Sequence, residues 1–446
     1  MSTQYLILGA TLPDGSRSDL RIASGLIVER GTALKADGAQ IVDANGLIAL
    51  PGLVDLHTHL REPGFEQSET VLTGTRAAAA GGFTSVFAMA NTMPVADTSG
   101  VVEQVQSLGD AAGYATVRPI GAVTVGLAGE RLSEIGAMAH SRAAVSVFSD
   151  DGKCVHDSLL MRRALEYVKT FDGVIAQHAQ DPRLTEKSQM NEGALSSELG
   201  LAGWPAVAEE SIIARDVLLA EHVGARLHIC HLSTAGSVDV MRWAKARGID
   251  VTAEVTPHHL LLTEELVRSY DARFKVNPPL RRDEDVLALR AGVADGTIDI
   301  IATDHAPHPD EAKDCEWDHA AFGMVGLESA LSVTQTALVD TGIIGWNDVA
   351  RLLSHAPARI GRLKGHTHDF AVGSPANLTL TDPGASSTFG LDNLAGKSRN
   401  SPYLGMTLAG SVRWTFHHGY ATLQDGALTS PAEVAAAAIE WRATHG

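Results

Sequence analysis

The sequence is poor in cysteine, with three among its 446 residues. Cys154, Cys230 and Cys315 contain no Cys-x-x-Cys pair, so neither a disulfide framework nor the usual thiolate motif of metal and redox sites is present. We expect Cys154 and Cys230 to be small buried residues, not ligands. This cysteine usage fits a protein of the reducing cytoplasm.

Long apolar runs and an excess of basic residues are also missing. No segment approaches the ~18 uninterrupted apolar residues of a membrane-spanning helix, and the start MSTQYLILGATLPDGS lacks the pattern of a signal peptide. The 35 basic and 53 acidic residues give a net charge of −18, which repels nucleic acid and anionic membranes. We therefore expect small-molecule partners, no nucleic acid and no membrane. An anionic substrate would need a local cluster of cations.

Between residues 52 and 365, short apolar runs alternate with helical stretches such as HDSLLMRRALEYVKT. This alternation is typical of βαβ units on a parallel sheet. The eight runs are LVDLHTHL, FTSVFAMAN, VRPIGAV, AAVSVFSDD, GVIAQHA, RLHICHLST, DVTAEVTPHH and DIIATDHAPH. Eight such units predict an α/β fold of the (β/α)8 TIM-barrel type.

Both ends of the chain have a different pattern. Residues 1–51 read as short strands separated by Gly, Asp and Asn turns, and strand patterns return after about residue 365 in GSPANLTLTD and SVRWTFHHGYATLQDG. We expect 1–51 and 366–446 to form one small β-sandwich domain into which the barrel, 52–365, is inserted. The alanine-rich SPAEVAAAAIEW opens with a capping-box pattern and predicts a terminal helix over about 431–443.

Histidines and aspartates stand at the ends of five of the eight runs, where a barrel gathers its loops around one site. They are His57, His59, Asp151, His178, His231 and Asp304. His57 and His59 are two residues apart, so on a strand both can reach one metal ion. Nitrogen and oxygen ligands without thiolate favour zinc, with manganese, cobalt or iron as substitutes. Six ligands exceed the three of a usual catalytic zinc, so we expect two ions.

Six motifs spread over the barrel carry a resemblance to a known family. They are PGLVDLHTHLREPG at 51–64, AMANTMP at 88–94, FSDDG at 148–152, EVTPHHL at 254–260, KVNPPLR at 275–281 and IATDHAPH at 301–308. In this order they resemble the amidohydrolase superfamily and, within it, the dihydroorotases of the bacterial long-chain type. The resemblance implies a reversible, zinc-dependent cyclisation of N-carbamoyl-L-aspartate to dihydroorotate and water in pyrimidine biosynthesis.

The resemblance also implies a role for each ligand. It assigns one zinc to His57, His59 and Asp304, and the second to His178 and His231. The bridge between the ions falls on Asp151, with Asp150 as the fallback, whereas related hydantoinases and allantoinases bridge with a carboxylated lysine. A hydroxide between the ions would attack the ring amide carbonyl, while Asp304 takes its proton and passes it to the leaving nitrogen.

The carboxylate that the substrate keeps in both directions needs a fixed partner. The family pattern gives that role to Arg61, Asn91 and His308, of which Arg61 can grip a carboxylate with two hydrogen bonds. The same pattern gives Asn277 a contact with the pyrimidine ring.

One loop departs from the family pattern. Phe322-Gly323 stands where the family usually has Pro-Gly, in a loop whose backbone touches the substrate. Gly323 keeps the flexible position, so we expect the pair to remain at the substrate. His258 and His259 carry no ligand role over from the family, and we expect them to pack or bond behind the ligands.

Two other functions are compatible with the sequence. A hydantoinase or allantoinase would use the same barrel and metal site, although Arg61, Asn91 and the missing bridging lysine argue against it. An inactive homologue would serve as a scaffold for aspartate transcarbamoylase, although such proteins typically lose metal ligands and all six are present here. For the active enzyme we expect a homodimer, with aspartate transcarbamoylase as a candidate partner.

Overall fold

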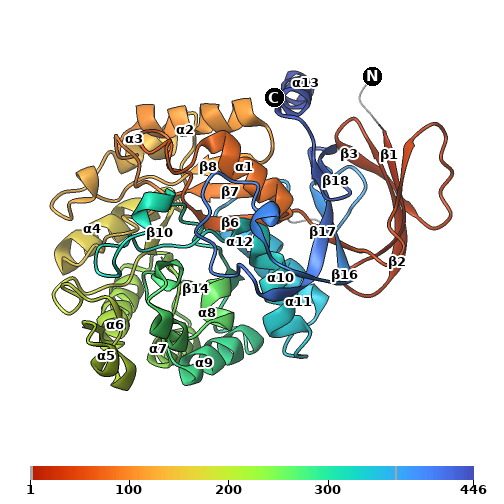
Figure 1. The fold of residues 1–446 in the computed structure, drawn as a ribbon. Coiled ribbons are helices and arrows are strands. Elements are labelled where there is room, and N and C mark those ends of the chain that lie inside the picture. The colour runs from red at the N-terminus through yellow and green to blue at the C-terminus, as the bar shows by residue number, and fades with distance from the viewer. Residues whose placement is uncertain (1–3, 367–368, 446) are drawn as a thin grey trace.

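The computed structural model describes residues 4–366 and 369–445, which form a barrel with a separate β sheet beside it (Figure 1). The central strands of the barrel are surrounded by helices, and the sheet is made from both ends of the chain. Within the described residues, no helix has the length and hydropathy needed to cross a membrane.

Eight parallel strands build the barrel, one in each predicted apolar run. They are β6 (Leu53–Thr58), β7 (Phe83–Ala88), β8 (Thr116–Pro119), β9 (Val147–Phe148), β10 (Val174–Gln177), β13 (Leu227–Ile229), β14 (Val251–Val255) and β15 (Ile300–Ile301). Hydrogen bonds order them as β6-β7-β8 and β9-β10-β13-β14-β15. Single bridges, Gly121 to Phe148 and Thr58 to His305, join the two groups. The predicted fold is confirmed, but single bridges replace continuous ladders at two junctions.

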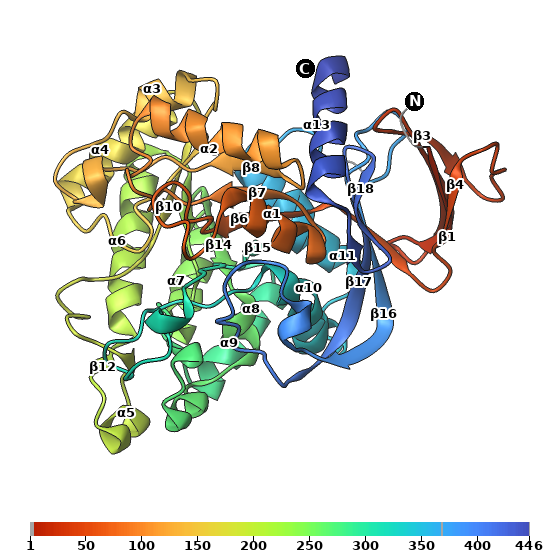
Figure 2. The same cartoon turned by 45° about the horizontal axis from the view of Figure 1, so that its top comes forward.

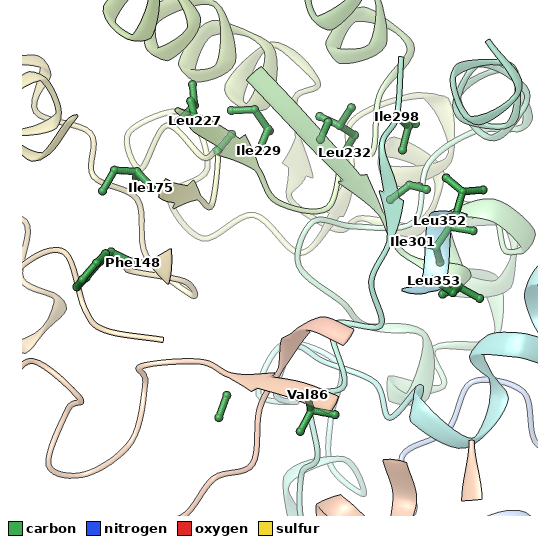
Figure 3. Close-up of a cluster of buried hydrophobic side chains, with 14 of the residues drawn as sticks. Val86, Phe148, Ile175, Leu227, Ile229, Leu232, Ile298, Ile301, Leu352 and Leu353 are labelled. Atoms are coloured by element: carbon green, nitrogen blue, oxygen red, sulfur yellow. The ribbon is translucent and has the colours of Figure 1, made fainter. Parts of the chain in front are cut away.

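Neighbouring residues of these strands face two different apolar layers. Val174 and Ala176 of β10 belong to a cluster inside the barrel, whereas Ile175 between them belongs to the larger cluster shared with the helices. Strand β15 repeats this pattern, with Ile300 inside and Ile301 outside. Figure 3 shows part of the outer layer, with Ile175 and Ile301 among its labelled side chains. The strands are therefore buried on both faces, which explains their continuous apolar runs.

The helices cover the outer layer with apolar stripes. In α4 (Ser158–Lys169), Asp157 caps the first turn by accepting from the Leu160 backbone, and the buried residues recur at helical spacing. The other helices between the strands are α1 (Val71–Ala80), α2 (Ser99–Ala112), α3 (Ile135–His140), α5 (Ala194–Leu199), α6 (Val207–Val223), α7 (Ala235–Ala246), α8 (Pro257–Leu261) and α9 (Asp283–Ala294). Helices α10 (Ala330–Thr334), α11 (Trp346–Ala350) and α12 (Ala356–Ile360) follow β15.

Helix α12 closes the amino-terminal end of the barrel. Ser146, just before β9, donates its hydroxyl to the Gly361 carbonyl at 2.7 Å. Arg226, just before β13, donates to the Ile360 carbonyl at 2.9 Å. Because this end is filled, the carboxyl ends of the strands are left to carry the site.

A second sheet joins the two ends of the chain. Its path is β19-β18-β17-β16-β5-β1-β2-β3, and β4 pairs with β1. Its strands are β1 (Tyr5–Thr11), β2 (Arg17–Ala23), β3 (Leu26–Gly31), β4 (Gln40–Asp43), β5 (Ile48–Pro51), β16 (Leu378–Thr388), β17 (Thr407–His417), β18 (Tyr420–Gln424) and β19 (Ala427–Leu428). The antiparallel pair β5–β16 ties the two ends together. Strands β16 and β17 lie between the barrel and β1–β3 (Figures 1 and 2).

Two further elements complete the chain. Helix α13 (Pro431–His445) carries the alanine-rich terminal segment and is tied to α2 by Arg442, which donates to the Asp110 carbonyl at 2.6 Å. A short ladder of β11 (Met190–Asn191) and β12 (Gly203–Trp204) follows β10 and was not predicted. The division into a barrel over 52–365 and a composite β domain stays a prediction.

Candidate metal centre

The structure brings the six predicted ligands together at the carboxyl ends of the strands. His57 lies at the end of β6 and His59 directly after it, while the other four follow β9, β10, β13 and β15. All are buried, with at most 5% of the residue surface exposed. The six are His57, His59, Asp151, His178, His231 and Asp304.

Four of these residues form a first group of possible ligands, whose ligand atoms all lie within 4.8 Å of one another. The His57 Nε2 atom is 3.3 Å from Asp151 Oδ1 and 3.4 Å from Asp304 Oδ1. The His59 Nε2 atom is 3.3 Å from Asp151 Oδ2 and 3.1 Å from Asp304 Oδ1. Two imidazoles and two carboxylates thus converge on one point.

Asp151 also belongs to a second group, with His178 and His231. Its Oδ1 is 3.2 Å from His178 Nδ1 and 3.4 Å from His231 Nε2. These two imidazole nitrogens are 2.9 Å apart. One carboxylate therefore reaches two neighbouring groups of metal-binding atoms.

The donor set fits a metal centre. The buried His57 Nε2 has no hydrogen-bond partner among the described residues, although it faces two carboxylates. On the far side of the ring, Nδ1 is 2.5 Å from Glu254 Oε1, which holds the proton on Nδ1 and leaves the Nε2 lone pair for a cation. Imidazole and carboxylate donors without thiolate match the preferences of zinc.

Mutual electrostatics keep the aspartates of the centre ionised. Burial acts to raise the pKa of Asp304, but His57 and His59 outweigh it and hold that pKa at about 2. Burial likewise opposes ionisation of Asp151, while His57 and the bonded His178 and His231 hold its pKa well below the usual range. Both carboxylates are therefore available as anionic ligands near neutral pH.

Three functional candidates have a left-handed backbone that side chains rarely adopt. The φ angles are 63° at Arg61, 31° at His231 and 47° at Asp304. Such conformations cost free energy and persist only where the surrounding structure imposes them, often at functional sites. All three lie just beyond the ends of barrel strands, after β6, β13 and β15.

Asp150, the fallback bridge, points away from both ligand groups. Its Oδ1 accepts from the Val123 and Thr124 backbone at 2.8 and 2.9 Å, and Oδ2 accepts from the Thr124 hydroxyl. It anchors the loop after β8, so Asp151 is the bridging candidate.

Arg61, Asn91 and His308 border the first ligand group. Asn91 Oδ1 is 2.9 Å from Nδ1 of His59, so the amide positions this ligand and keeps its Nδ2 donor for another partner. Arg61 Nε donates to the Pro307 carbonyl at 3.1 Å, and Arg61 Nη2 lies 3.5 Å from His308 Nε2. Burial, and then the charge of Arg61, lower the pKa of His308 to about 3, so this ring is neutral.

The loop with Phe322 and Gly323 contacts His308 beside the first ligand group. His308 Nε2 donates to the Phe322 carbonyl at 2.8 Å. The Gly323 N–H donates to the Lys275 carbonyl at 3.0 Å. At Gly323 φ is 135°, and a Cβ atom would lie 2.8 Å from His308 Nε2, so the position requires glycine.

Asn277 reaches the second ligand group through a residue that sequence reasoning missed. Its Nδ2 donates to Gln180 Oε1 at 3.1 Å, and the same oxygen is 2.7 Å from His178 Nε2. The Asn277 Oδ1 atom is buried without a partner among the described residues. The signal for Gln180 was its position two residues after His178.

Glu254 was also missed as a functional residue. It is buried in β14, and besides His57 it contacts His228 Nε2 at 3.0 Å and accepts from the His231 backbone at 3.1 Å. Burial acts to raise its pKa, but His57 and His228 outweigh burial and lower it. A carboxylate inside an apolar run was the available signal, because Glu is almost never buried unpaired.

Three neighbours of the ligands behave as packing or bonding residues. His259 bonds Thr256 Oγ1 at 2.8 Å and the Pro278 carbonyl at 3.2 Å, so it supports the segment after Asn277. His258 is buried, and burial lowers the pKa of its imidazole to about 4. Cys230 forms a third possible group with His57 and Glu254, but burial raises the pKa of its thiol and disfavours a thiolate ligand.

Comparison with known proteins identifies the family. Residues 46–237 match the family model described as dihydro-orotase-like. The chain is 78% identical to the dihydroorotase of Leifsonia xyli subsp. xyli over 424 residues, which cover 95% of this chain and 97% of that protein. The chain belongs to the dihydroorotase family. Within it, the Streptomyces coelicolor dihydroorotase is 66% identical, covering 96% of this chain and all of that protein (100%).

Solved structures support the fold of this dihydroorotase family member. The dihydropyrimidinase of Brevibacillus agri superposes with a TM-score of 0.84 at 21% identity, covering 97% of each chain. The L-hydantoinase of Arthrobacter aurescens gives 0.84 at 22% identity, covering 96% of this chain and 97% of that one. At this identity the likeness shows the amidohydrolase fold alone, so the hydantoinase alternative gains no support from it.

Proposed function

We propose that the chain closes N-carbamoyl-L-aspartate to dihydroorotate and water, and reverses this reaction, at a centre of two zinc ions. The observation that carries the proposal is that both ligand groups share Asp151. A binuclear hydrolytic centre places its ions ~3.5–4 Å apart, which requires a bridging group of this kind. A complete and buried ligand set also argues for an active enzyme and against a scaffold alone.

The first zinc would be held by His57, His59 and Asp304, the second by His178 and His231, with Asp151 between them. When bound, two cations lower the pKa of a water molecule between them and polarise the amide carbonyl of the substrate. The residues around the centre then have to hold the substrate and move one proton.

Asp304 is the residue that we assign to the proton. Its Oδ1 faces His57 and His59, which leaves Oδ2 for the proton. As a metal ligand, Asp304 starts as a carboxylate. In hydrolysis it accepts a proton from the attacking hydroxide as the tetrahedral intermediate forms, and it donates this proton to the leaving ring nitrogen. In ring closure the same two proton transfers occur in the reverse direction.

Arg61, Asn91 and His308 are the residues that we assign to the substrate carboxylate. With Nε bonded to Pro307, the Arg61 guanidinium has its Nη atoms left for a two-point contact. Asn91 contributes Nδ2, because Oδ1 is taken by His59. Arg61 supplies the positive charge of this set, because Asn91 and His308 are neutral.

We assign the ring of the substrate to Asn277 and the Phe322–Gly323 loop. The unpartnered Asn277 Oδ1 is an acceptor suited to a ring N–H. The Phe322 carbonyl is hydrogen-bonded to His308, and the Gly323 N–H is hydrogen-bonded to the Lys275 carbonyl. These two bonds fix the position of the loop next to His308.

The test is turnover by the zinc-loaded chain with dihydroorotate and, in parallel, hydantoin and allantoin. We expect turnover of dihydroorotate in one direction and of N-carbamoyl-L-aspartate in the other, and loss of both in Asp151→Ala. Asp150→Ala is the matched control, because Asp150 lies beside the bridge but faces the loop after β8. Hydantoin turnover without dihydroorotate turnover would overturn the assignment.

We also infer from the family resemblance that the enzyme works as a homodimer and that aspartate transcarbamoylase is a candidate partner. Light scattering on the chain alone should give twice the chain mass. The same measurement with the transcarbamoylase added tests the partner, and unchanged masses would exclude association.

A further inference from the structure

Two buried lysines outside the metal centre have no role in the proposed chemistry. Lys275 is 2% exposed and Lys313 is 9% exposed. Lysine is seldom buried unless it is paired. Among the described residues, however, neither ammonium has a carboxylate oxygen within 4.0 Å. Their burial is costly and calls for a compensating set of contacts.

Backbone carbonyls satisfy Lys313 completely. Its Nζ donates to the carbonyls of Ala272 and Lys275, both at 3.0 Å, and of Ala321 at 2.6 Å. In its charged form Lys313 has three N–H donors, and each faces one of these carbonyls. Two of the carbonyls belong to the 272–275 segment and the third to the loop that carries Lys313 itself.

Lys275 makes the reverse connection. Its Nζ donates to the Trp317 carbonyl at 2.5 Å and approaches the Asp318 carbonyl at 3.3 Å. The same ammonium lies 4.6 Å from the centre of the Phe322 ring, a cation–π distance. Each lysine thus donates across the gap between the 272–277 segment and the 312–323 loop.

Phe322 extends this connection to a third segment. Its ring meets the Trp204 ring edge-on, with centroids 6.0 Å apart. Trp204 lies in the short β12 strand, which no other part of the proposed mechanism uses. Phe322 therefore lies between the Lys275 ammonium and β12.

We propose that Lys275 and Lys313 are positioning residues that hold the 312–323 loop against the 272–277 segment and thereby set the affinity for substrate. The loop fixes His308 through the Phe322 carbonyl, and the segment leads to Asn277. This inference rests on the proposed function, because it assumes that His308 and Asn277 contact the substrate. The lysines themselves do not touch the reacting atoms.

The experiment compares Lys275→Met and Lys313→Met with the native chain, and Lys35→Met is the control because that lysine is exposed in the loop between β3 and β4. Hydrogen–deuterium exchange of peptides covering 312–323 should become roughly tenfold faster in both variants. In the zinc-loaded enzymes, KM should rise roughly tenfold, while kcat and zinc content stay within about twofold. Lys35→Met should leave all four quantities unchanged.

Exchange is measured without turnover, so it separates the two proposals. A native chain that fails to turn over dihydroorotate would overturn the proposed function and leave the loop test intact. Unchanged exchange and unchanged KM in either folded lysine variant would overturn the role of that lysine. If the lysine variants do not fold, Phe322→Leu replaces them, since it removes the ring over Lys275. Native exchange in that variant would overturn the proposal.

Discussion

The ring of His57 lies between Glu254 and the metal centre, with Nδ1 2.5 Å from Glu254 Oε1 and Nε2 facing Asp151 and Asp304. The carboxylate selects the tautomer in which Nε2 is free to bind a cation. Glu254 also bonds the His231 backbone, so one side chain supports both ligand groups.

Glu254→Ala should therefore weaken metal binding by roughly 10–100-fold, with the loss shared by both ions. The measurement is zinc affinity by competition with a chelator. Glu440→Ala on the exposed face of α13 is the control and should bind zinc like the native chain. Native affinity in Glu254→Ala would mean that the hydrogen bond does not prepare the ligand.

Asp304→Asn should keep much of the zinc but lose turnover. The amide oxygen can still coordinate, whereas the amide cannot accept and return a proton near neutral pH. We expect kcat to fall by roughly 10²–10⁴-fold, the usual contribution of a general acid–base group. Metal analysis and steady-state kinetics on one preparation check both halves. A near-native kcat would remove Asp304 from the proton transfer.

Arg61→Met should mainly damage substrate binding. The variant keeps the aliphatic part of the side chain but removes the charge that faces the substrate carboxylate. Losing a charged hydrogen bond of ~1.5–3 kcal/mol corresponds to roughly a 10–150-fold fall in kcat/KM. Because Arg61 bonds the Pro307 carbonyl, circular dichroism and zinc content should first show an intact fold. An unchanged KM would contradict carboxylate recognition by Arg61.

Lys313 should make stability depend on pH. Burial, with a smaller contribution from Lys275, lowers its pKa from 10.5 to about 7 in the folded chain. Between these values the unfolded chain binds more protons, so the free energy of unfolding should rise with pH, by at most about 1.4 kcal/mol per unit from this group. Urea unfolding measured from about pH 7 to 9 gives the slope of the free energy of unfolding against pH. This slope should be smaller in Lys313→Met than in the native chain. Equal slopes in both proteins would contradict the prediction.

The strands and the ligands were readable from the sequence for one physical reason. Strands buried on both faces produce continuous apolar runs, and the first polar residues after each run fall at the barrel mouth. His178 after β10 and Asp304 after β15 are examples. Such residues stand out because nothing in a packed core requires them.

Other features left no comparable signal. β11 and β12 have two residues each, too few for any periodicity to appear. Glu254 sits inside an apolar run, so its partners, which come from β6 and β13, are invisible in the local sequence. At two junctions of the barrel, neighbouring strands are joined by a single bridge. The distance between neighbouring strands is not specified by the pattern of apolar residues in the sequence.

In the proposed centre, Asp151 joins two zinc ions. Crystals of the zinc-loaded chain, with anomalous diffraction recorded at the zinc edge, test it directly. We expect two peaks roughly 3.5–4 Å apart with one Asp151 oxygen on each side, and only traces of zinc in Asp151→Ala. A single peak, or two peaks with Asp151 bound to neither, would show that Asp151 does not bridge two ions.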